Sequence, residues 1–103
     1  MFETSLQKGF QITFANGLTA SVQWGVGNYC DNHFSSQDFC APAKSTNAEV
    51  AVIGTDGELI DYVESFLPEG VSTDGTVAGW LSPEEVAEFL YRVSTWGTDA
   101  FPF

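Results

Sequence analysis

The stretch GFQITFANGLTASVQWG, from Gly9 to Gly25, decides the fold of this chain because apolar and polar side chains alternate on both sides of Asn16-Gly17. Strict alternation is typical of a half-buried β-strand. An Asn-Gly pair between two alternating runs is a strong hairpin signal. The stretch therefore predicts a β-hairpin.

The length of the hairpin loop follows from which side chains must share a face. A two-residue turn would pair Phe14 with Thr19 and place the two apolar sets on opposite faces. Burial of one apolar face favours a three-residue loop, residues 15–17, because a register slip of one residue would expose every apolar side chain. The expected partners are then Phe14 and Leu18, Ile12 and Ala20, and Phe10 and Val22.

The residues on the other face of this hairpin are all polar and uncharged. Charged side chains are a usual guard against edge-to-edge pairing of sheets, and these two strands carry none. The face is either an ordinary polar surface or a contact surface for another sheet, so we expect a monomer or a weak homodimer. The residues concerned are Gln11, Thr13, Thr19, Ser21 and Gln23.

A second hairpin is predicted in EVAVIGTDGELIDYV, residues 49–63, where a turn of the same kind joins two apolar runs. Its loop is expected at residues 55–57, again with glycine in the last position. The expected cross-strand partners are Val52 and Ile60, and Val50 and Tyr62.

The helix signal begins at Ser82, which is suited to the N-cap position. Pro83 fits the first helical position, and Glu85 completes a Ser-x-x-Glu capping box. Gly97 is a suitable stop. Between these ends, apolar residues recur at helical spacing and predict one buried stripe: Val86, Phe89, Leu90, Val93 and Trp96.

These elements predict a single domain over residues 1–103 with an α+β fold. A chain of this length can bury a core but does not divide into two domains. We expect an antiparallel sheet of two β-hairpins with one C-terminal helix packed on one face. The sheet has four strands, or five if residues 76–78 add a short one.

Charge restricts the partners of this chain. Fourteen acidic and three basic residues give a net charge of −11, and eleven carboxylates with a single base, Arg92, follow from Glu49 onward. Such a field repels nucleic acid and anionic membranes and attracts basic protein surfaces. Apolar runs are too short to span a membrane, and the first residues lack signal-peptide features, so we expect a cytoplasmic protein.

The acidic residues are the first candidate binding surface. One interpretation is a solvated face that keeps an aromatic-rich domain in solution. The other is a surface that stands in for nucleic-acid phosphates, since duplex DNA carries one charge per roughly 1.7 Å of its axis. The candidate residues are Asp56, Glu58, Asp61, Glu64, Glu84, Glu85 and Glu88.

Aromatic residues beside irregular segments form a second candidate surface. By default they belong to the core, but aromatic anchors on loops also dominate protein interfaces. They could equally stack a nucleotide base, with the backbone amides around Gly25 and Gly27 receiving phosphate. The candidate residues are Trp24, Tyr29, Phe34 and Trp80, with Phe39 nearby.

Residues that could support chemistry are few. Cys30 and Cys40 could be bridged, free or metal-bound, and without an export signal we expect free thiols. A zinc site would combine both cysteines and His33 with Asp31 or Asp38, but a second closely spaced ligand pair is missing. A Cys-His dyad rests on loop spacing alone. We therefore expect no enzyme, no metal and no cofactor.

The stretches KGFQITFANGLTASVQWGVGNYCDN and VAGWLSPEEVAEFLYRV resemble small uncharacterised proteins encoded by bacteriophages, over roughly half of the chain. No residue roles transfer with the resemblance. It implies a setting in the bacterial host cell, where small acidic phage proteins of the anti-CRISPR kind occupy a site on a host immune complex. We therefore expect a non-enzymatic inhibitor that occupies a basic, nucleic-acid-binding surface. The alternatives are a sponge for a nucleotide signal and a structural or assembly protein of the phage.

Overall fold

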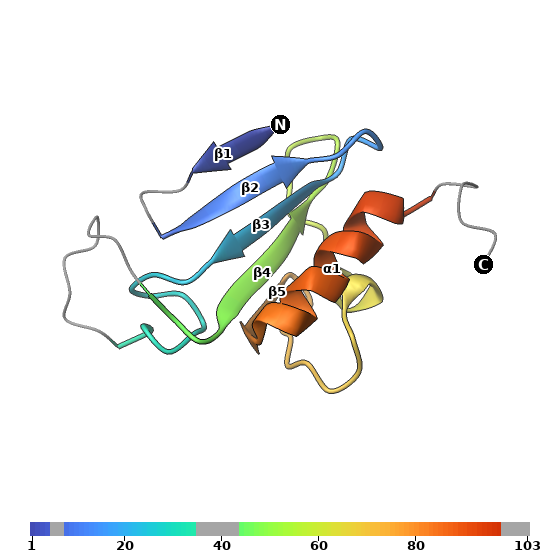
Figure 1. Ribbon diagram of the computed structural model, residues 1–103. Helices are drawn as coiled ribbons and strands as arrows, with labels where there is room; N and C mark the ends of the chain where they lie inside the picture. The colour runs from blue at the N-terminus through green and yellow to red at the C-terminus, as the bar shows by residue number, and fades with distance from the viewer. Residues whose placement is uncertain (5–7, 35–43, 98–103) are drawn as a thin grey trace.

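A five-stranded antiparallel sheet is the framework of the computed structural model, which describes residues 1–4, 8–34 and 44–97 (Figure 1). The strands follow one another in chain order across the sheet. They are β1 (Phe2–Thr4), β2 (Gly9–Thr13), β3 (Thr19–Gln23), β4 (Ala48–Ile53) and β5 (Val77–Leu81). A 3-10 helix, η1 (Val63–Phe66), precedes β5, and the helix α1 (Pro83–Thr95) ends the described fold. The predicted α+β class is confirmed.

The first hairpin has the predicted register. Phe10 lies opposite Val22 and Ile12 opposite Ala20, and the backbone N–H of Phe14 donates to the carbonyl of Leu18 at 2.9 Å. Gly17 closes the three-residue loop with a φ of 87°, in the left-handed region that glycine adopts without steric cost. Burial of one face therefore selects this register, as the sequence predicts.

The second hairpin is only partly formed, and the predicted pairing of Val50 with Tyr62 is wrong. The turn has the expected register, since Ile53 and Leu59 form an isolated bridge and Ile60 N–H donates to the Val52 carbonyl at 2.9 Å. Beyond Ile60 the chain leaves the sheet and enters η1. There Val63 and Phe66 become fully buried. Their burial in the core replaces a continued strand, and β5 takes the vacated edge, pairing Ala78 with Val50.

The helix begins as predicted. Ser82 Oγ accepts from Glu85 N–H at 3.2 Å, and Glu85 Oε1 accepts from Ser82 N–H at 2.8 Å, which completes the capping box. At the other end, Asn16 Nδ2 donates to the carbonyl of Val93 at 2.8 Å, so the first hairpin's turn supports the last turn of α1. Gly97 follows with a φ of 70°, as expected of a helix stop.

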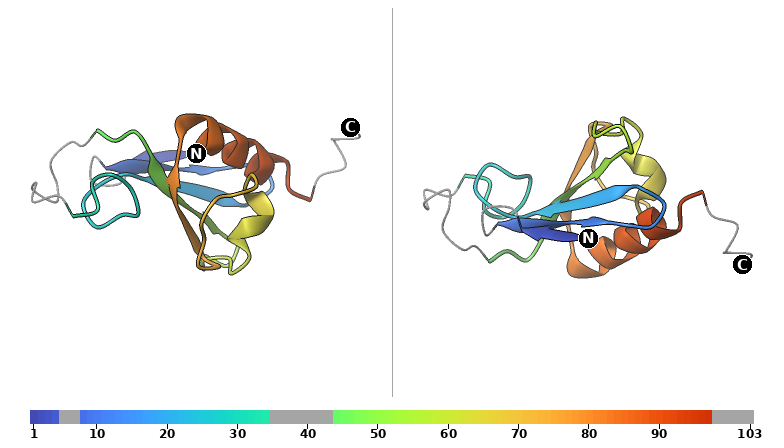
Figure 2. Two further views of the ribbon diagram at one scale, coloured as in Figure 1. Left: turned by 90° about the horizontal axis from the view of Figure 1, so that it is seen from below. Right: turned by 90° about the horizontal axis from the view of Figure 1, so that it is seen from above.

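The core lies between α1 and one face of a strongly twisted sheet (Figure 2). Phe89 and Val93 of the predicted stripe are fully buried, whereas Trp96 remains 42% exposed. The other face of the sheet carries the neutral polar residues, with the hydroxyls of Thr13 and Thr19 2.8 Å apart across β2 and β3. Ala51 of β4 belongs to the same face, because it pairs with Ser21 of β3.

Candidate functional site

A β-bulge in β5 creates the most unusual surface feature of the molecule. Val50 pairs with Ala78 and Ala48 with Leu81, so three steps along β5 match two along β4. Residues three apart in a regular strand point to opposite faces. Here Ala78 and Leu81 are both fully buried, while Trp80 between them is 52% exposed. The bulge therefore lets both Ala78 and Leu81 point into the core, while the indole of Trp80 points outward.

The outward position of Trp80 has a backbone cost. Its φ is 58°, and it is the one non-glycine residue with a positive φ in the described parts of the chain. The left-handed region costs an L-residue about 1–2 kcal/mol. Strain of this kind persists only where the surroundings impose it, and it clusters at functional sites.

Tyr29 holds the bulge in place from outside the sheet. Its carbonyl accepts the Trp80 N–H at 2.8 Å, and the two rings stack with centroids 5.7 Å apart and planes inclined by 19°. Gly79 makes this approach possible, because a Cβ at that position would lie 2.5 Å from the Tyr29 Cβ. The Gly79-Trp80 dipeptide is therefore matched to Tyr29.

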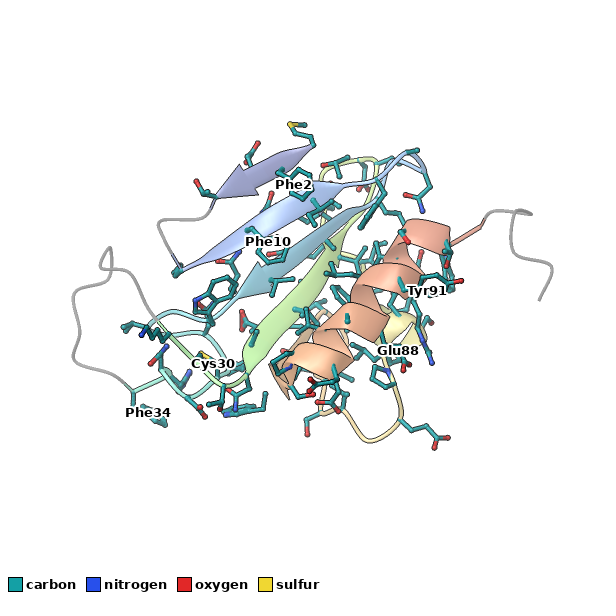
Figure 3. All side chains as sticks on the ribbon, viewed as in Figure 1. Phe2, Phe10, Cys30, Phe34, Glu88 and Tyr91 are labelled. Carbon is teal, nitrogen blue, oxygen red and sulfur yellow. The ribbon has the colours of Figure 1, made fainter. Side chains whose placement is uncertain are left out.

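Two further rings extend this stack into an exposed aromatic cluster, comprising Tyr29, His33, Phe34 and Trp80. The His33 ring lies 5.4 Å from the Tyr29 ring and 4.4 Å from the Phe34 ring, centroid to centroid. Phe34 is 93% exposed and projects from the loop at the end of the sheet farthest from the last turn of α1 (Figure 3). Exposed aromatic side chains that touch one another are typical of interaction surfaces.

Hydrogen bonds within residues 25–33, and between this loop and β4, pre-organise the cluster. Glu49, which lies opposite the bulge, accepts from Asn28 Nδ2 at 3.0 Å and from Tyr29 N–H at 3.3 Å. Asn28 Oδ1 accepts from Gly25 N–H at 2.9 Å, and the Asn28 carbonyl lies 2.9 Å from His33 Nδ1. The loop is thereby tied to β4 as well as to itself.

These bonds also bear on the alternative that the amides around Gly25 and Gly27 receive phosphate. The amide of Gly25 donates to Asn28, and the amide of Gly27 donates to the His33 carbonyl at 3.2 Å. Both donors that were expected to receive phosphate are thus already used within the loop. The arrangement does not favour phosphate binding there.

The residues of the alternative zinc site do not converge among the described ranges. Cys30 is a free thiol, 1% exposed, which donates to the Gly25 carbonyl at 3.7 Å. Asp31 accepts hydrogen bonds from the Thr46 hydroxyl and from Asn47, and these bonds lower the pKa of its carboxyl. No group of three potential metal ligands occurs within the described ranges, and Asp38, Phe39 and Cys40 lie outside them.

A cleft of about 210 Å³ adjoins the aromatic cluster. Tyr29, Gly79 and Trp80 form one side of it, and the turn that contains Asp74 forms the other. Asp74 Oδ1 accepts from the amides of Val77 at 2.9 Å and Thr76 at 3.0 Å. These bonds hold the pKa of the Asp74 carboxyl below its ordinary value of 3.8. Sequence reasoning missed Asp74, although its Asp-Gly turn was visible.

Trp24 lies apart from the aromatic cluster. Its ring packs edge-on against Phe10, with centroids 6.1 Å apart, beside an apolar pocket of about 300 Å³ where α1 begins. Of the four predicted aromatic residues, the structure therefore brings together Tyr29, Phe34 and Trp80. His33 is the member of the cluster that was considered only as a metal ligand or base.

The predicted acidic residues fall into two groups. Asp56 and Glu58 lie in the exposed turn after β4. Asp61 lies between that turn and η1, and Glu64 lies in η1. The second group lies on the first two turns of α1 and comprises Glu84, Glu85 and Glu88. η1 packs near the end of α1, where the Phe66 and Trp96 rings lie 4.5 Å apart, whereas the second group lies toward the beginning of the helix.

The helical acids differ in how free they are to meet a partner. Glu84 is exposed, whereas the carboxylate of Glu85 caps the helix. Glu88 Oε2 lies 2.6 Å from Arg92 Nη2, and Arg92 Nη1 also donates to the Leu67 carbonyl at 2.9 Å. An exposed ion pair between residues four apart on a helix adds only about 0.3–0.5 kcal/mol to helix stability.

Comparison with protein-family models, with curated proteins and with solved structures finds no match to this chain. Within the described residues, no helix is both long and apolar enough to cross a membrane. The function is therefore inferred from the residues and their geometry.

Proposed function

We propose that this chain is a non-enzymatic binding protein that occupies a basic, nucleic-acid-binding surface of a larger complex. The phage resemblance suggests that this complex belongs to bacterial defence, as CRISPR effectors do. The observation that carries the proposal is the charge of the chain from Glu49 onward, with eleven carboxylates and one base. Such a surface is attracted to Lys/Arg-rich grooves and repelled by nucleic acid itself.

The structure supports this proposal by the way it presents the acids. Six of the seven predicted acidic residues are exposed, and they lie on a turn, on η1 and on α1 rather than on a free tail. Charges held on a packed scaffold lose little conformational freedom on binding, so more of their attraction is available to the complex. Electrostatic complementarity of this kind raises the association rate above all.

Among the described residues, Cys30 and His33 make contacts within their own loop. The Cys30 thiol is 1% exposed and directed at a backbone carbonyl, and His33 Nδ1 faces the carbonyl of Asn28. An activated nucleophile would instead need a base within hydrogen-bond reach and access to a substrate. The arrangement favours binding over catalysis.

The test is a titration against purified CRISPR effector complexes at low and high salt. We expect binding that weakens steeply with salt and is lost when Asp56, Asp61, Glu84 and Glu88 are replaced by lysine. To test the location of the charge, the pair Glu84→Gln and Glu88→Gln is compared with added lysines at Thr13 and Ser21, on the face of the sheet away from α1, because each pair changes the net charge by +2. Binding that ignores salt, or that falls equally with both pairs of changes, would contradict the proposal.

A further inference from the structure

We propose that the cleft between Trp80, Tyr29 and Asp74 receives the guanidinium group of an arginine from a protein partner. This inference deepens the proposed function, on which it rests for the basic character of the partner. It assigns to the aromatic cluster a role that the net charge alone does not require.

The chemistry of the cleft fits a guanidinium group. Trp80 offers a half-exposed indole, and arginine stacks on aromatic faces with both cation–π and planar contact. Asp74 lines the same cleft and supplies a carboxylate. The combination of a flat ring and a carboxylate matches the two recognition features of the arginine side chain.

The carboxylate is both fixed and available. The hydrogen bonds that Asp74 accepts from residues 76 and 77 all end on Oδ1. Within the described ranges, Oδ2 accepts none. A fixed carboxylate with one free oxygen can bind an incoming donor without first losing an internal bond.

The size and charge of the cleft argue against a nucleotide. Pockets for drug-sized ligands are typically about 300–1,000 Å³, so a cleft of about 210 Å³ suits one side chain better. Asp74 and the net charge of −11 also oppose a phosphate-bearing ligand. A base stacked on Trp80 would have to bring its phosphate into this field.

The backbone strain supports a role in contact rather than in packing. Trp80 has a left-handed φ of 58°, and its side chain faces outward. Ala78 and Leu81 of the same strand are buried in the core, so Trp80 is not needed to fill it. A glycine would adopt this conformation without cost. The large side chain in a costly conformation therefore indicates that the exposed ring itself is used.

The experiment is an NMR titration of the full chain with a blocked Gly-Arg-Gly peptide, its citrulline counterpart and AMP. Citrulline keeps the shape of arginine but carries no charge. We expect saturable shifts of the Trp80 indole and of the Thr76 and Val77 amides with the arginine peptide. The citrulline peptide should bind roughly tenfold more weakly, and AMP should not bind.

Two substitutions separate a specific site from general attraction. Asp74→Asn keeps the Oδ1 acceptor and removes the charge, so binding of the arginine peptide should fall roughly five- to tenfold. Asp56→Asn makes the same change in a comparable turn, where Asp56 Oδ1 accepts from Glu58 N–H at 3.0 Å, and should leave binding unchanged. Trp80→Asn removes the ring with a residue that tolerates a positive φ, and should abolish the response.

Three results would overturn this inference: no shift with the arginine peptide, equal losses in the two Asp→Asn variants, or stronger shifts with AMP. The last would indicate a nucleotide site instead. The proposed function fails separately, through binding to effector complexes that does not depend on salt or on the acidic residues. The arginine-binding role of the cleft can therefore be disproved while the proposed role of the acidic residues is upheld, and the reverse is also true.

Discussion

The two halves of the sheet are built differently. Between β2 and β3 the ladder is regular, and its outer face is neutral, with Thr13 and Thr19 joined across the strands. At β5 the ladder contains a bulge, a tryptophan with positive φ and an exposed ring stack. Both halves contribute to the core, with Ala20 and Val22 from β3 and with Ala78 and Leu81 from β5, but only the irregular half uses backbone energy to place a side chain at the surface. That difference locates the candidate contact site.

The largest expected effect comes from filling the space between Gly79 and Tyr29. Gly79→Ala would put a Cβ 2.5 Å from the Tyr29 Cβ, so the loop must move away from β5. We expect a loss of about 1–3 kcal/mol in the free energy of unfolding, measured with urea. Stacking of Tyr29 on Trp80 should be lost as well, which the indole chemical shift would report.

Gly27→Ala is the matched control for that change. Gly27 has a φ of 87° but nothing within 4 Å of an added Cβ, so only the backbone conformation is penalised, by about 1 kcal/mol. If Gly79→Ala costs no more than Gly27→Ala, close packing of Tyr29 on β5 is not what holds the bulge.

The helix cap tests a local interaction where β5 passes into α1. Ser82→Ala removes the side-chain acceptor for Glu85 N–H and should lower the free energy of unfolding by about 1 kcal/mol. The ring signals of the aromatic cluster should persist, because the change removes one hydrogen bond of the cap and no atom of the cluster. Changed signals in the cluster would show that the two regions are not independent.

The neutral face of the first hairpin bears on self-association. Thr13→Lys with Ser21→Lys should abolish any dimer built on this face, as seen by light scattering. The free energy of unfolding should fall by no more than about 1 kcal/mol, because both side chains point away from the core and the main loss is the hydroxyl hydrogen bond between Thr13 and Thr19. A dimer that survives the pair of changes would lie elsewhere, and the aromatic cluster would be the first place to examine.

The smallest expected effect is a pH dependence that arises from the irregular half. The pKa of Asp74 is lowered in the fold by the amides of Val77 and Thr76, so the folded state favours the charged carboxylate. This stability is present above the ordinary pKa of 3.8 and is lost as the pH falls through the lower pKa of the folded state. Asp74→Asn should reduce the loss of stability on acidification, measured by urea unfolding at several pH values.

Local signals explain what the sequence could predict. The register of the first hairpin follows from Asn16-Gly17 and from alternation within a few residues, and the helix start follows from Ser82 and Glu85. Both depend on neighbours in the chain. The α+β class follows from these elements because each must bury its apolar face against the other.

Long-range competition explains what the sequence could not predict. Tyr62 and Ala78 compete for the position opposite Val50, and the outcome depends on the burial of Val63 and Phe66 in the core. The bulge at Trp80 is a compromise between β4 pairing and the contact with Tyr29. Neither the competition for Val50 nor the bulge produces a recognisable pattern within a short stretch of sequence. The sequence therefore did not predict the cleft with Asp74.

The most direct test of the central claim, that Trp80 serves contact rather than packing, is the free energy of unfolding of Trp80→Gly. Glycine relieves about 1–2 kcal/mol of backbone strain. It loses about 0.5–1.5 kcal/mol of stacking on Tyr29 and about 0.5–1 kcal/mol of chain entropy, together with the burial of the covered half of the ring. We expect a loss of no more than about 2 kcal/mol in the free energy of unfolding, while the response to the arginine peptide disappears. A loss of about 3–5 kcal/mol, as for a core tryptophan, with the response retained, would contradict it.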